Sequence, residues 1–401
     1  MVRPRAALGT LIPATLALAF LADAALRQLP RAAVSFRAWE AARTPGGDGP
    51  FLPDFIYRND QAYGDLAALG NLPAARELRP EFFVTDAFGY PNQPDVLSRG
   101  SAGILLYGSS YSVGAEVPFA DALAAQLSQR TGLVVYNAAS GDYRLPELVE
   151  VARRVLSPGG TVVLEYPESR DPPALLATLA PRGVAACRLR LAPADLAGLC
   201  SRWFALRRRL EFSPLAVLAQ RGRKWLENGS ILPNPYATRV VRRRLPDGRA
   251  MLFLADDTVR AQRPPSVAAA ARYLRWLRGK VEGAGFRLVV LLVPDKYGVY
   301  RRLLVPPDAA TLPGDRYLPD LAARLRTAGT PVADLSATFR AAARDGLGSG
   351  TTVYYRDDTH WNARGIALAA DALADVMRRD TRCCDTLPAP RSTPLYHPKP
   401  P

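Results

Sequence analysis

The sequence has few of the residues on which metal and redox chemistry depend. Of its 401 residues, only 2 are His, 4 are Cys and 3 are Met. The cysteines form no Cys-x-x-Cys pair, which argues against a zinc site and against a dithiol redox motif. A reaction that needs a histidine base has only His360 and His397 to draw on, because histidine is the side chain whose ordinary pKa lies nearest neutral pH.

The four cysteines nevertheless fit an oxidising compartment. Cys187 and Cys200 flank a basic segment and could pair. Cys383 and Cys384 are adjacent, and we expect them to bond elsewhere or to stay reduced.

Lysine is scarce as well, although the formal net charge is +15. It occurs only at positions 224, 280, 296 and 399, so nearly all the positive charge is arginine. The arginine clusters at residues 207–209 and 242–244 lack the interleaved aromatic residues of a single-strand groove, and no DNA-binding motif is present. We therefore expect no nucleic-acid partner, while an acidic glycan or a phospholipid surface stays open.

The N-terminal 30 residues predict export as a signal peptide or a membrane anchor. Arg3 and Arg5 precede an uncharged run over residues 6–22, and Ala22-Asp23-Ala24 has the small-x-small form of a signal-peptidase site. The run is intermediate in length between a signal-peptide core and a membrane-spanning helix, and Arg27 follows closely. We expect a periplasmic protein that is either released by cleavage or held by a single inner-membrane anchor.

The chain is long enough to bury a full core, either as one large domain with an insertion or as two smaller domains. It has no fixed-period repeat. We expect an irregular lead-in over residues 31–98, with a small hairpin at residues 82–90, followed by an α/β domain over residues 99–380. An insertion without clear periodicity interrupts this domain at about residues 171–264, and the Pro-rich tail, residues 381–401, is expected to be disordered.

Strands and helices alternate within the α/β domain. This alternation predicts a doubly wound, mostly parallel sheet that is flanked by helices on both faces. The expected strands are residues 104–107, 133–136, 161–164, 287–293 and 331–334, and the expected helices are residues 118–129, 145–156, 266–282, 318–327 and 363–377.

Gly108-Ser109-Ser110-Tyr111-Ser112 follows the first of these strands directly. A strand that ends in Gly-x-Ser presents a hydroxyl at the carboxyl edge of the sheet, where ligands of open α/β sheets bind. Ser110 is therefore a candidate nucleophile. Taken alone, the same pattern is also that of a turn residue or of a helix N-cap.

His360 is the better placed of the two histidines to serve as its base. His397 lies in the Pro-rich tail, which cannot hold a side chain in fixed geometry. His360 lies on a strand-to-helix loop with Asp358 and Asp357 two and three residues upstream, so one ring nitrogen could serve Ser110 while a carboxylate fixes the other. The alternative is a surface histidine beside an N-cap aspartate.

Together these segments resemble the SGNH (GDSL) hydrolase superfamily, and within it the alginate O-acetyltransferase group of the AlgX/AlgJ type. The resemblance rests on residues 108–112, on Asp358-Thr359-His360-Trp361 and on residues 294–300, with a looser match of residues 165–170 to a Trp-Glu-x-Pro-Glu-Arg segment. It covers roughly residues 103–377 outside the insertion. Two features depart from these families. The Asp-x-His-Trp segment follows the serine motif instead of preceding it as in the alginate enzymes, and the Gly-x-Asn-Asp block of SGNH enzymes is absent.

The residues can be given roles in acyl transfer. Ser110 would attack the acyl carbon while His360 takes its proton, and Asp358, with Asp357 as the alternative, would orient the imidazole. Backbone N–H groups of Ser110 and Gly141 would form the oxyanion hole, although Gly141 also fits an ordinary turn.

Four further residues are candidates for substrate binding. Tyr111 could line the acyl pocket or pack, and Trp361 could stack on a sugar or cap the core. Lys296 and Arg170 lie at expected strand ends, where they could bind the carboxylate of a uronate or be ordinary solvated charges.

The sequence thus predicts a periplasm-facing O-acetyltransferase that passes an acetyl group from Ser110 to a hydroxyl of an exopolysaccharide, without a metal ion or other cofactor. The resemblance implies that a membrane-bound O-acyltransferase supplies the acetyl group. The same residues also fit a secreted esterase or carbohydrate deacetylase. A third hypothesis is a non-catalytic scaffold or glycan-binding protein of a secretion complex.

Overall fold

A computed structural model describes residues 4–29, 38–42, 51–70, 72–98, 100–140, 145–170 and 240–380, together with short pieces between residues 213 and 226. The expectations for the cysteines, Gly141, His397, the tail and most of the insertion concern residues outside these ranges.

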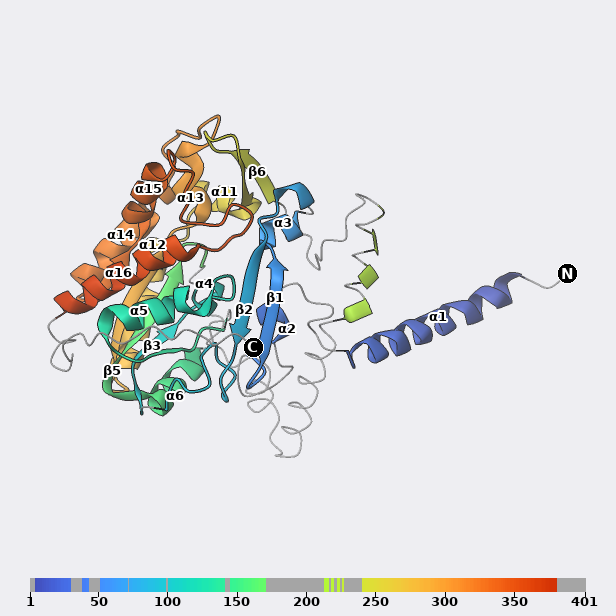
Figure 1. Ribbon diagram of the computed structural model, residues 1–401, viewed down its shortest axis with the longest axis horizontal. Helices are drawn as coiled ribbons and strands as arrows, with labels where there is room; N and C mark the ends of the chain where they lie inside the picture. Colours follow the sequence, from blue (N-terminus) through green and yellow to red (C-terminus); the bar gives the residue numbers. More distant parts are fainter. Residues whose placement is uncertain are drawn as a thin grey trace.

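A five-stranded parallel sheet forms the centre of the molecule (Figure 1). Its strand order is β4-β3-β5-β8-β9, and every neighbouring pair is parallel. This confirms the expected doubly wound α/β fold. The chain adds β4 on one side of β3 and then adds β5, β8 and β9 on the other side, so the order of strands reverses at β3. The strands are β3 (Ala102–Tyr107), β4 (Val135–Asn137), β5 (Leu156–Pro167), β8 (Arg287–Val293) and β9 (Val332–Asp334).

Helices cover both faces of this sheet. Leu105 and Val162 face one layer and Ile104 and Val163 face the other, because successive strand side chains alternate between faces. The first layer consists of α6 (Leu145–Val155), α12 (Val267–Glu282) and α14 (Gly314–Thr327). The second consists of α5 (Leu123–Thr131), α15 (Ser336–Asp345) and α16 (Ala363–Arg379), and α5 and α16 run side by side in Figure 1.

The N-terminal lead-in is more ordered than the sequence predicted. β1 (Ile56–Ala62) and β2 (Arg79–Val84) form an antiparallel pair, with α3 (Asp65–Leu69) between them in the chain. The hairpin expected at residues 82–90 is therefore wrong, because residues 82–84 belong to β2, which pairs with the preceding strand β1 and not with a following one. Figure 1 shows the two strands standing along one edge of the α/β body.

The end of the expected insertion also belongs to the folded core. β6 (Val240–Arg244) and β7 (Ala250–Leu254) form a hairpin, followed by α11 (Ala255–Gln262). Met251 and Phe253 of β7 are buried in the second layer. Two strands of five residues each, one of them with three arginines, carry too few residues to show a clear period.

Helix α1 (Pro4–Leu26) lies apart from the α/β body in Figure 1. Among the described residues, no helix combines the length and the apolar character that crossing a membrane requires.

Candidate active site

The serine loop, residues 108–113, follows β3 and contains a short helix, α4 (Ser110–Val113). Ser109 is the N-cap of this helix, and its hydroxyl oxygen accepts the N–H of Tyr111 at 3.3 Å. Ser110 is therefore the first helical residue and not the cap. Its side chain is half-buried at the carboxyl edge of the sheet.

Glu165 of the central strand β5 anchors this loop from beneath. Its carboxylate accepts the N–H of Ser109 at 2.6 Å and the hydroxyls of Ser109 and Ser112 at 2.9 and 3.2 Å. Glu165 is fully buried, and burial raises its pKa while the hydrogen bonds from Ser109 oppose that rise. Gly108 permits this approach, because a Cβ there would lie 2.5 Å from Glu165 Oε2.

Asn137, at the end of β4, secures the other side of the loop. Its side-chain amide donates to the carbonyl of Ser112 at 2.7 Å, and its backbone N–H donates to the side-chain oxygen of Asn92 at 2.8 Å. Within the described ranges, the backbone N–H of Ser110 has no acceptor, which leaves it available to a developing oxyanion. The second expected donor, Gly141, is not among the described residues.

The histidine loop, residues 356–361, brings His360 to Ser110. His360 Nε2 lies 2.8 Å from Ser110 Oγ, and His360 Nδ1 lies 2.6 Å from Asp358 Oδ1. His360 is 3% exposed, so it is not the surface histidine of the alternative interpretation. Two side chains 250 positions apart in sequence are thus joined with a carboxylate in one hydrogen-bonded chain.

Asp358, and not Asp357, is the carboxylate that contacts the imidazole. Asp358 also accepts the backbone N–H of His360 at 2.9 Å, which fixes the carboxylate against the ring. Asp357 instead accepts the N–H groups of Gly64 at 2.7 Å and Glu77 at 2.9 Å. It therefore joins the loop to the N-terminal segment.

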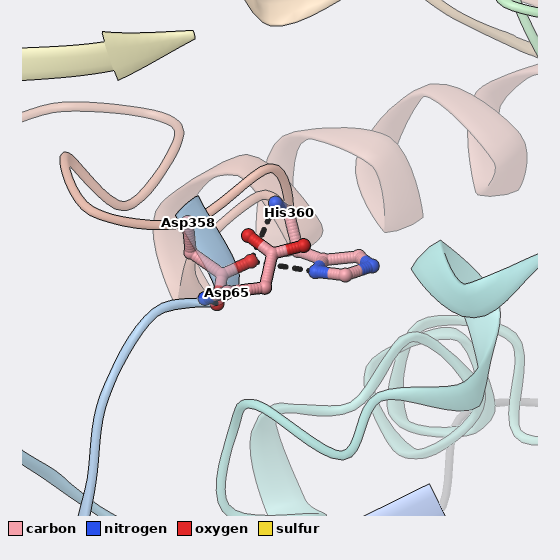
Figure 2. A group of neighbouring side chains, drawn as sticks. All are labelled: Asp65, Asp358 and His360. Carbon is pink, nitrogen blue, oxygen red and sulfur yellow. Dashed lines mark hydrogen bonds and ion pairs between the residues drawn. The ribbon is translucent and has the colours of Figure 1, made fainter. Parts of the chain in front are cut away.

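Asp65, the first residue of α3, binds the histidine loop at Thr359, between Asp358 and His360. Its two carboxylate oxygens accept the backbone N–H of Thr359 at 2.7 Å and the Thr359 hydroxyl at 2.6 Å. Figure 2 shows Asp65, Asp358 and His360 gathered at this point. Among the described residues they are the one group whose ligand atoms could surround a metal ion, but each carboxylate already accepts hydrogen bonds from the protein. The arrangement fits a hydrogen-bonded relay better than a cation cage.

Arg79 of β2 binds both carboxylates of the histidine loop. Its two terminal nitrogens donate to Asp357 and Asp358, each at 2.9 Å, and its guanidinium stacks 3.9 Å from the centre of the Tyr355 ring. Burial works against the charge of Arg79, yet the two aspartates outweigh it and raise its pKa.

The electrostatics of the site favour a protonated imidazole. Burial disfavours that charge, but Glu116, whose carboxylate lies 3.5 Å from Nδ1, and Asp358 outweigh it and raise the pKa of His360 to about 9. In return, His360 and Arg79 hold the pKa of Asp358 below its ordinary value despite its burial.

Lys296 does not have the exposure that binding a uronate would require. It is 1% exposed at the start of α13 (Lys296–Tyr300), and its Nζ donates to the carbonyls of Arg356 at 3.1 Å and Asp358 at 2.8 Å. The expectation of a substrate-binding lysine is therefore wrong, because the histidine loop covers the side chain. Burial lowers its pKa to about 8.

Trp361 is likewise a packing residue and not a platform for sugars. It is 1% exposed, and its indole N–H donates to the carbonyl of Tyr111 at 3.0 Å, which ties the serine and histidine loops together. Tyr111 packs edge-on against His360, with ring centres 5.2 Å apart, and donates its hydroxyl to Thr359 at 3.2 Å. The half-buried Tyr111 thus forms a wall of the site. Arg170, in the turn after β5, is half-buried, and its charge opposes the rise in the pKa of Glu165.

Sequence reasoning missed Asp65, Arg79 and Glu116 entirely. None belongs to a motif, and Asp65 and Arg79 lie in a segment without periodicity. Glu165 lay inside the matched segment 165–170, and Asn137 directly follows an expected strand, but neither received a role. A carboxylate in the middle of an apolar strand was the available signal for Glu165, because such a group is rarely buried without partners.

Comparisons with known proteins agree with the resemblance over the C-terminal part of the chain. Residues 250–393 match the family model described as "SGNH hydrolase-like domain, acetyltransferase AlgX". This match includes the histidine loop and Lys296 but not Ser110. The expected likeness to the AlgX/AlgJ type is confirmed over that range.

Two individual proteins are similar to parts of the chain. "Probable alginate O-acetylase AlgJ" of Pseudomonas putida is 33% identical over 108 residues, which are 27% of this chain and 26% of that protein. The chain therefore spans about a quarter of the length of that relative. A solved structure from Slackia heliotrinireducens, provisionally named an SGNH hydrolase, is 16% identical with a TM-score of 0.31, over 68% of this chain and 97% of that one.

Proposed function

We propose, from the match of residues 250–393 to the AlgX family and from the contacts of Ser110, that this protein is a polysaccharide O-acetyltransferase. The observation that carries the proposal is the hydrogen-bonded chain from Ser110 Oγ through the imidazole of His360 to Asp358, with distances of 2.8 and 2.6 Å. A hydroxyl held in this way has a base for its proton and a carboxylate that orients the base.

The first half-reaction loads the serine. Ser110 Oγ attacks the acetyl carbonyl carbon while His360 Nε2 takes the hydroxyl proton, and the N–H of Ser110 stabilises the oxyanion. Asp358 holds the resulting imidazolium at Nδ1. The imidazolium then gives its proton to the departing oxygen, which leaves an acetyl ester on Ser110.

The second half-reaction unloads it. An acceptor hydroxyl gives its proton to His360 Nε2 and attacks the acetyl-serine carbonyl, and the same oxyanion donor serves again. When the tetrahedral intermediate collapses, the proton returns to Ser110 Oγ. Water in place of the acceptor would make the same residues an esterase, so the acceptor decides the outcome of the reaction.

The choice of acceptor and donor rests on the relatives. Since the printed name of one relative is an alginate O-acetylase, an exopolysaccharide of the alginate type is the proposed acceptor. In this proposal a membrane-bound O-acyltransferase delivers the acetyl group in the periplasm, and residues 1–30 serve as export signal or anchor.

The test uses purified protein with an acetyl ester such as p-nitrophenyl acetate, with and without acetyl-free oligouronate. We expect acetylated oligosaccharide by mass spectrometry and faster release of nitrophenol when the acceptor is present. Equal release in both reactions, with no acetylated sugar, would make the protein an esterase instead.

Ser110→Ala is the matched variant. We expect its turnover to fall by about 10³-fold or more, because removing the nucleophile leaves only binding and oxyanion stabilisation. Intact-protein mass spectrometry should detect an added acetyl group on the parent protein and none on the variant. If a correctly folded Ser110→Ala protein supported full acetylation of the host polymer, a scaffold role would replace the enzymatic one.

A further inference from the structure

A second carboxylate faces the imidazole from the serine side of the site. Glu116 lies in the turn after α4, and its Oε1 is 3.5 Å from His360 Nδ1. Their side chains are 12% and 4% exposed, so water screens the pair poorly. Glu116 makes an ion pair with the ring, whereas Asp358 makes the hydrogen bond.

The position of Glu116 is fixed by its neighbours. Ala115 and Val117 on either side are buried, and the hydroxyl of Tyr355 donates to the carbonyl of Glu116 at 3.0 Å. The turn therefore cannot swing the carboxylate away from His360 without breaking core contacts and this hydrogen bond.

Other charged groups surround the same ring, but they contact the histidine loop or a neighbouring pocket and not the imidazole in the way that Glu116 does. Arg79 and Lys296 are the cations, and both bind the histidine loop through Asp358. Glu81 of β2 shares a pocket with Glu116 but has no ion pair with the ring within 4.0 Å. The titratable and charged groups around His360 are Asp358 and Asp357 on its own loop, Asp65 on α3, Arg79 and Glu81 on β2, Tyr111 on α4, Glu116 after it, Lys296 on α13 and Tyr355 before the loop.

This geometry acts on the two forms of the imidazole in opposite ways. A protonated ring is attracted to Glu116, but its Nε2 carries a proton and cannot accept the one from Ser110. A neutral ring can accept that proton but loses the ion pair. The carboxylate therefore stabilises the protonated imidazole, both before the reaction and when it forms during attack. The neutral imidazole, which is the base, is disfavoured by comparison.

We propose that Glu116 is a positioning residue that keeps a second negative charge against His360 Nδ1 and thereby sets the pH range in which Ser110 can be activated. The proposal deepens the proposed function and rests on the roles of Ser110 and His360 given there.

Burial and charge support this inference. Glu116 is the largest of the charges that raise the pKa of His360, and the imidazolium in turn opposes the rise that burial causes in the pKa of Glu116. The two groups therefore titrate as a pair. Glu81 is different, because burial and Glu116 raise its pKa to about 8, so it is mostly neutral below that pH.

The first experiment needs no turnover. The full chain is labelled with ¹³C-histidine and its imidazole resonances are titrated by NMR. Only His360 and His397 contribute, so His397→Gln assigns the spectrum. In Glu116→Gln we expect the midpoint of His360 to fall by about one pH unit or more, while Glu81→Gln moves it less than half as far and His397 does not move. An unchanged midpoint in Glu116→Gln would overturn the proposal.

The second experiment measures acetyl-ester turnover against pH, with Ser110→Ala as the blank. On the acid side of the profile, Glu116→Gln should be about 10-fold more active than the parent protein, because a one-unit shift is tenfold in the fraction of neutral base. Glu116→Asp, which keeps the charge, should restore the parent profile at least in part.

A merely structural role for Glu116 would lower activity at every pH and leave the profile in place, which would also overturn the proposal. The two experiments separate this inference from the proposed function. If the NMR midpoint shifts but neither protein turns over an acetyl ester, Glu116 acts on His360 as inferred and the acetyltransferase proposal fails by itself.

Discussion

The serine loop and the histidine loop are joined by three hydrogen bonds, between Ser110 and His360 and between Tyr111 and both Thr359 and Trp361, yet they are supported by different parts of the molecule. The serine loop is held from within the central sheet, by Glu165 of β5 and Asn137 of β4. The histidine loop is held mainly from outside it, by Asp65 of α3 and Arg79 of β2. One half of the site is therefore a product of the α/β fold, and the other depends on the N-terminal segment.

A glycine permits close approach on each side. A Cβ on Gly108 would collide with Glu165, and a Cβ on Gly64 would lie 2.1 Å from the carbonyl oxygen of Asp357. Both supports therefore place backbone directly against a polar group with no room for a side chain. The difference between the loops lies in charge: one buried carboxylate supports the serine side, whereas several carboxylates and two cations converge on the histidine side.

Arg79→Ala should weaken the histidine side more than any other substitution considered. It leaves Asp357 and Asp358 buried without their shared cation, and removing one partner from a buried charge network typically costs about 3–5 kcal/mol. Urea unfolding would measure the loss, and ester turnover should fall with it. Arg58→Ala on the neighbouring strand removes an exposed arginine and should change stability by less than about 0.5 kcal/mol. Equal effects of the two substitutions would contradict the assigned role of β2.

The charges around His360 also predict that the free energy of unfolding falls as the pH rises above neutral. The pKa of His360 is raised to about 9, so its contribution is fully present below its unfolded pKa of about 6.5 and is lost as the pH rises through about 9. The loss can reach about 3 kcal/mol, since each pKa unit is worth about 1.4 kcal/mol. Because Lys296 and Glu81 titrate in the same range, the measurement is the difference in unfolding free energy between the parent protein and His360→Gln from pH 6 to 9.5. A difference independent of pH would contradict the ion pairs around the ring.

Glu165→Gln tests the serine side in the same way. The amide keeps one oxygen acceptor but turns an N–H₂ group toward donors of Ser109 and Ser112, so we expect a loss of about 1–3 kcal/mol in stability. Turnover should fall while the NMR midpoint of His360 stays within a few tenths of a unit. Glu150→Gln on the exposed side of α6 is the matched control and should have no effect. A large shift of the His360 midpoint would show that the two supports are not separate.

The serine side was largely predictable from the sequence, and the histidine side was not. Apolar runs of β3, β5 and β8 identified the sheet because burial on both faces leaves a continuous apolar signal. The motif after β3 then placed Ser110 at the edge of the sheet. The pairing with His360 followed because the chain has no other histidine near a strand end.

The rest depended on contacts that leave no periodic pattern. Asp65 and Arg79 reach residues nearly 300 positions away through polar side chains, and no local spacing announces such contacts. Spacing allowed Asp358 or, as the alternative, Asp357, and it is Asp358 whose carboxylate contacts the imidazole. Lys296 was expected to be accessible because strand ends usually are, but the loop that carries His360 covers it. For Trp361 the sequence left open stacking on a sugar or capping the core, and its burial against Tyr111 agrees with the second.

Lys296→Met should have the smallest effect on stability and act mainly on the histidine side. It removes two donors to the histidine loop but also removes a buried charge, and these changes oppose each other, so the net loss of stability should be below about 1.5 kcal/mol. Turnover should still fall by about 3–10-fold, because the carbonyl of Asp358 loses the donor that fixes the loop and small misplacements of a base are costly. Lys280→Met, at an exposed position of α12, should change neither quantity. Since both hydrogen bonds of Lys296 go to the histidine loop, and its one cation–π contact among the described residues is with the Phe253 ring at 5.4 Å, acetylation of Ser110 should slow while the urea midpoint moves little. A large loss of stability with full turnover would instead make Lys296 a core residue with no part in the site.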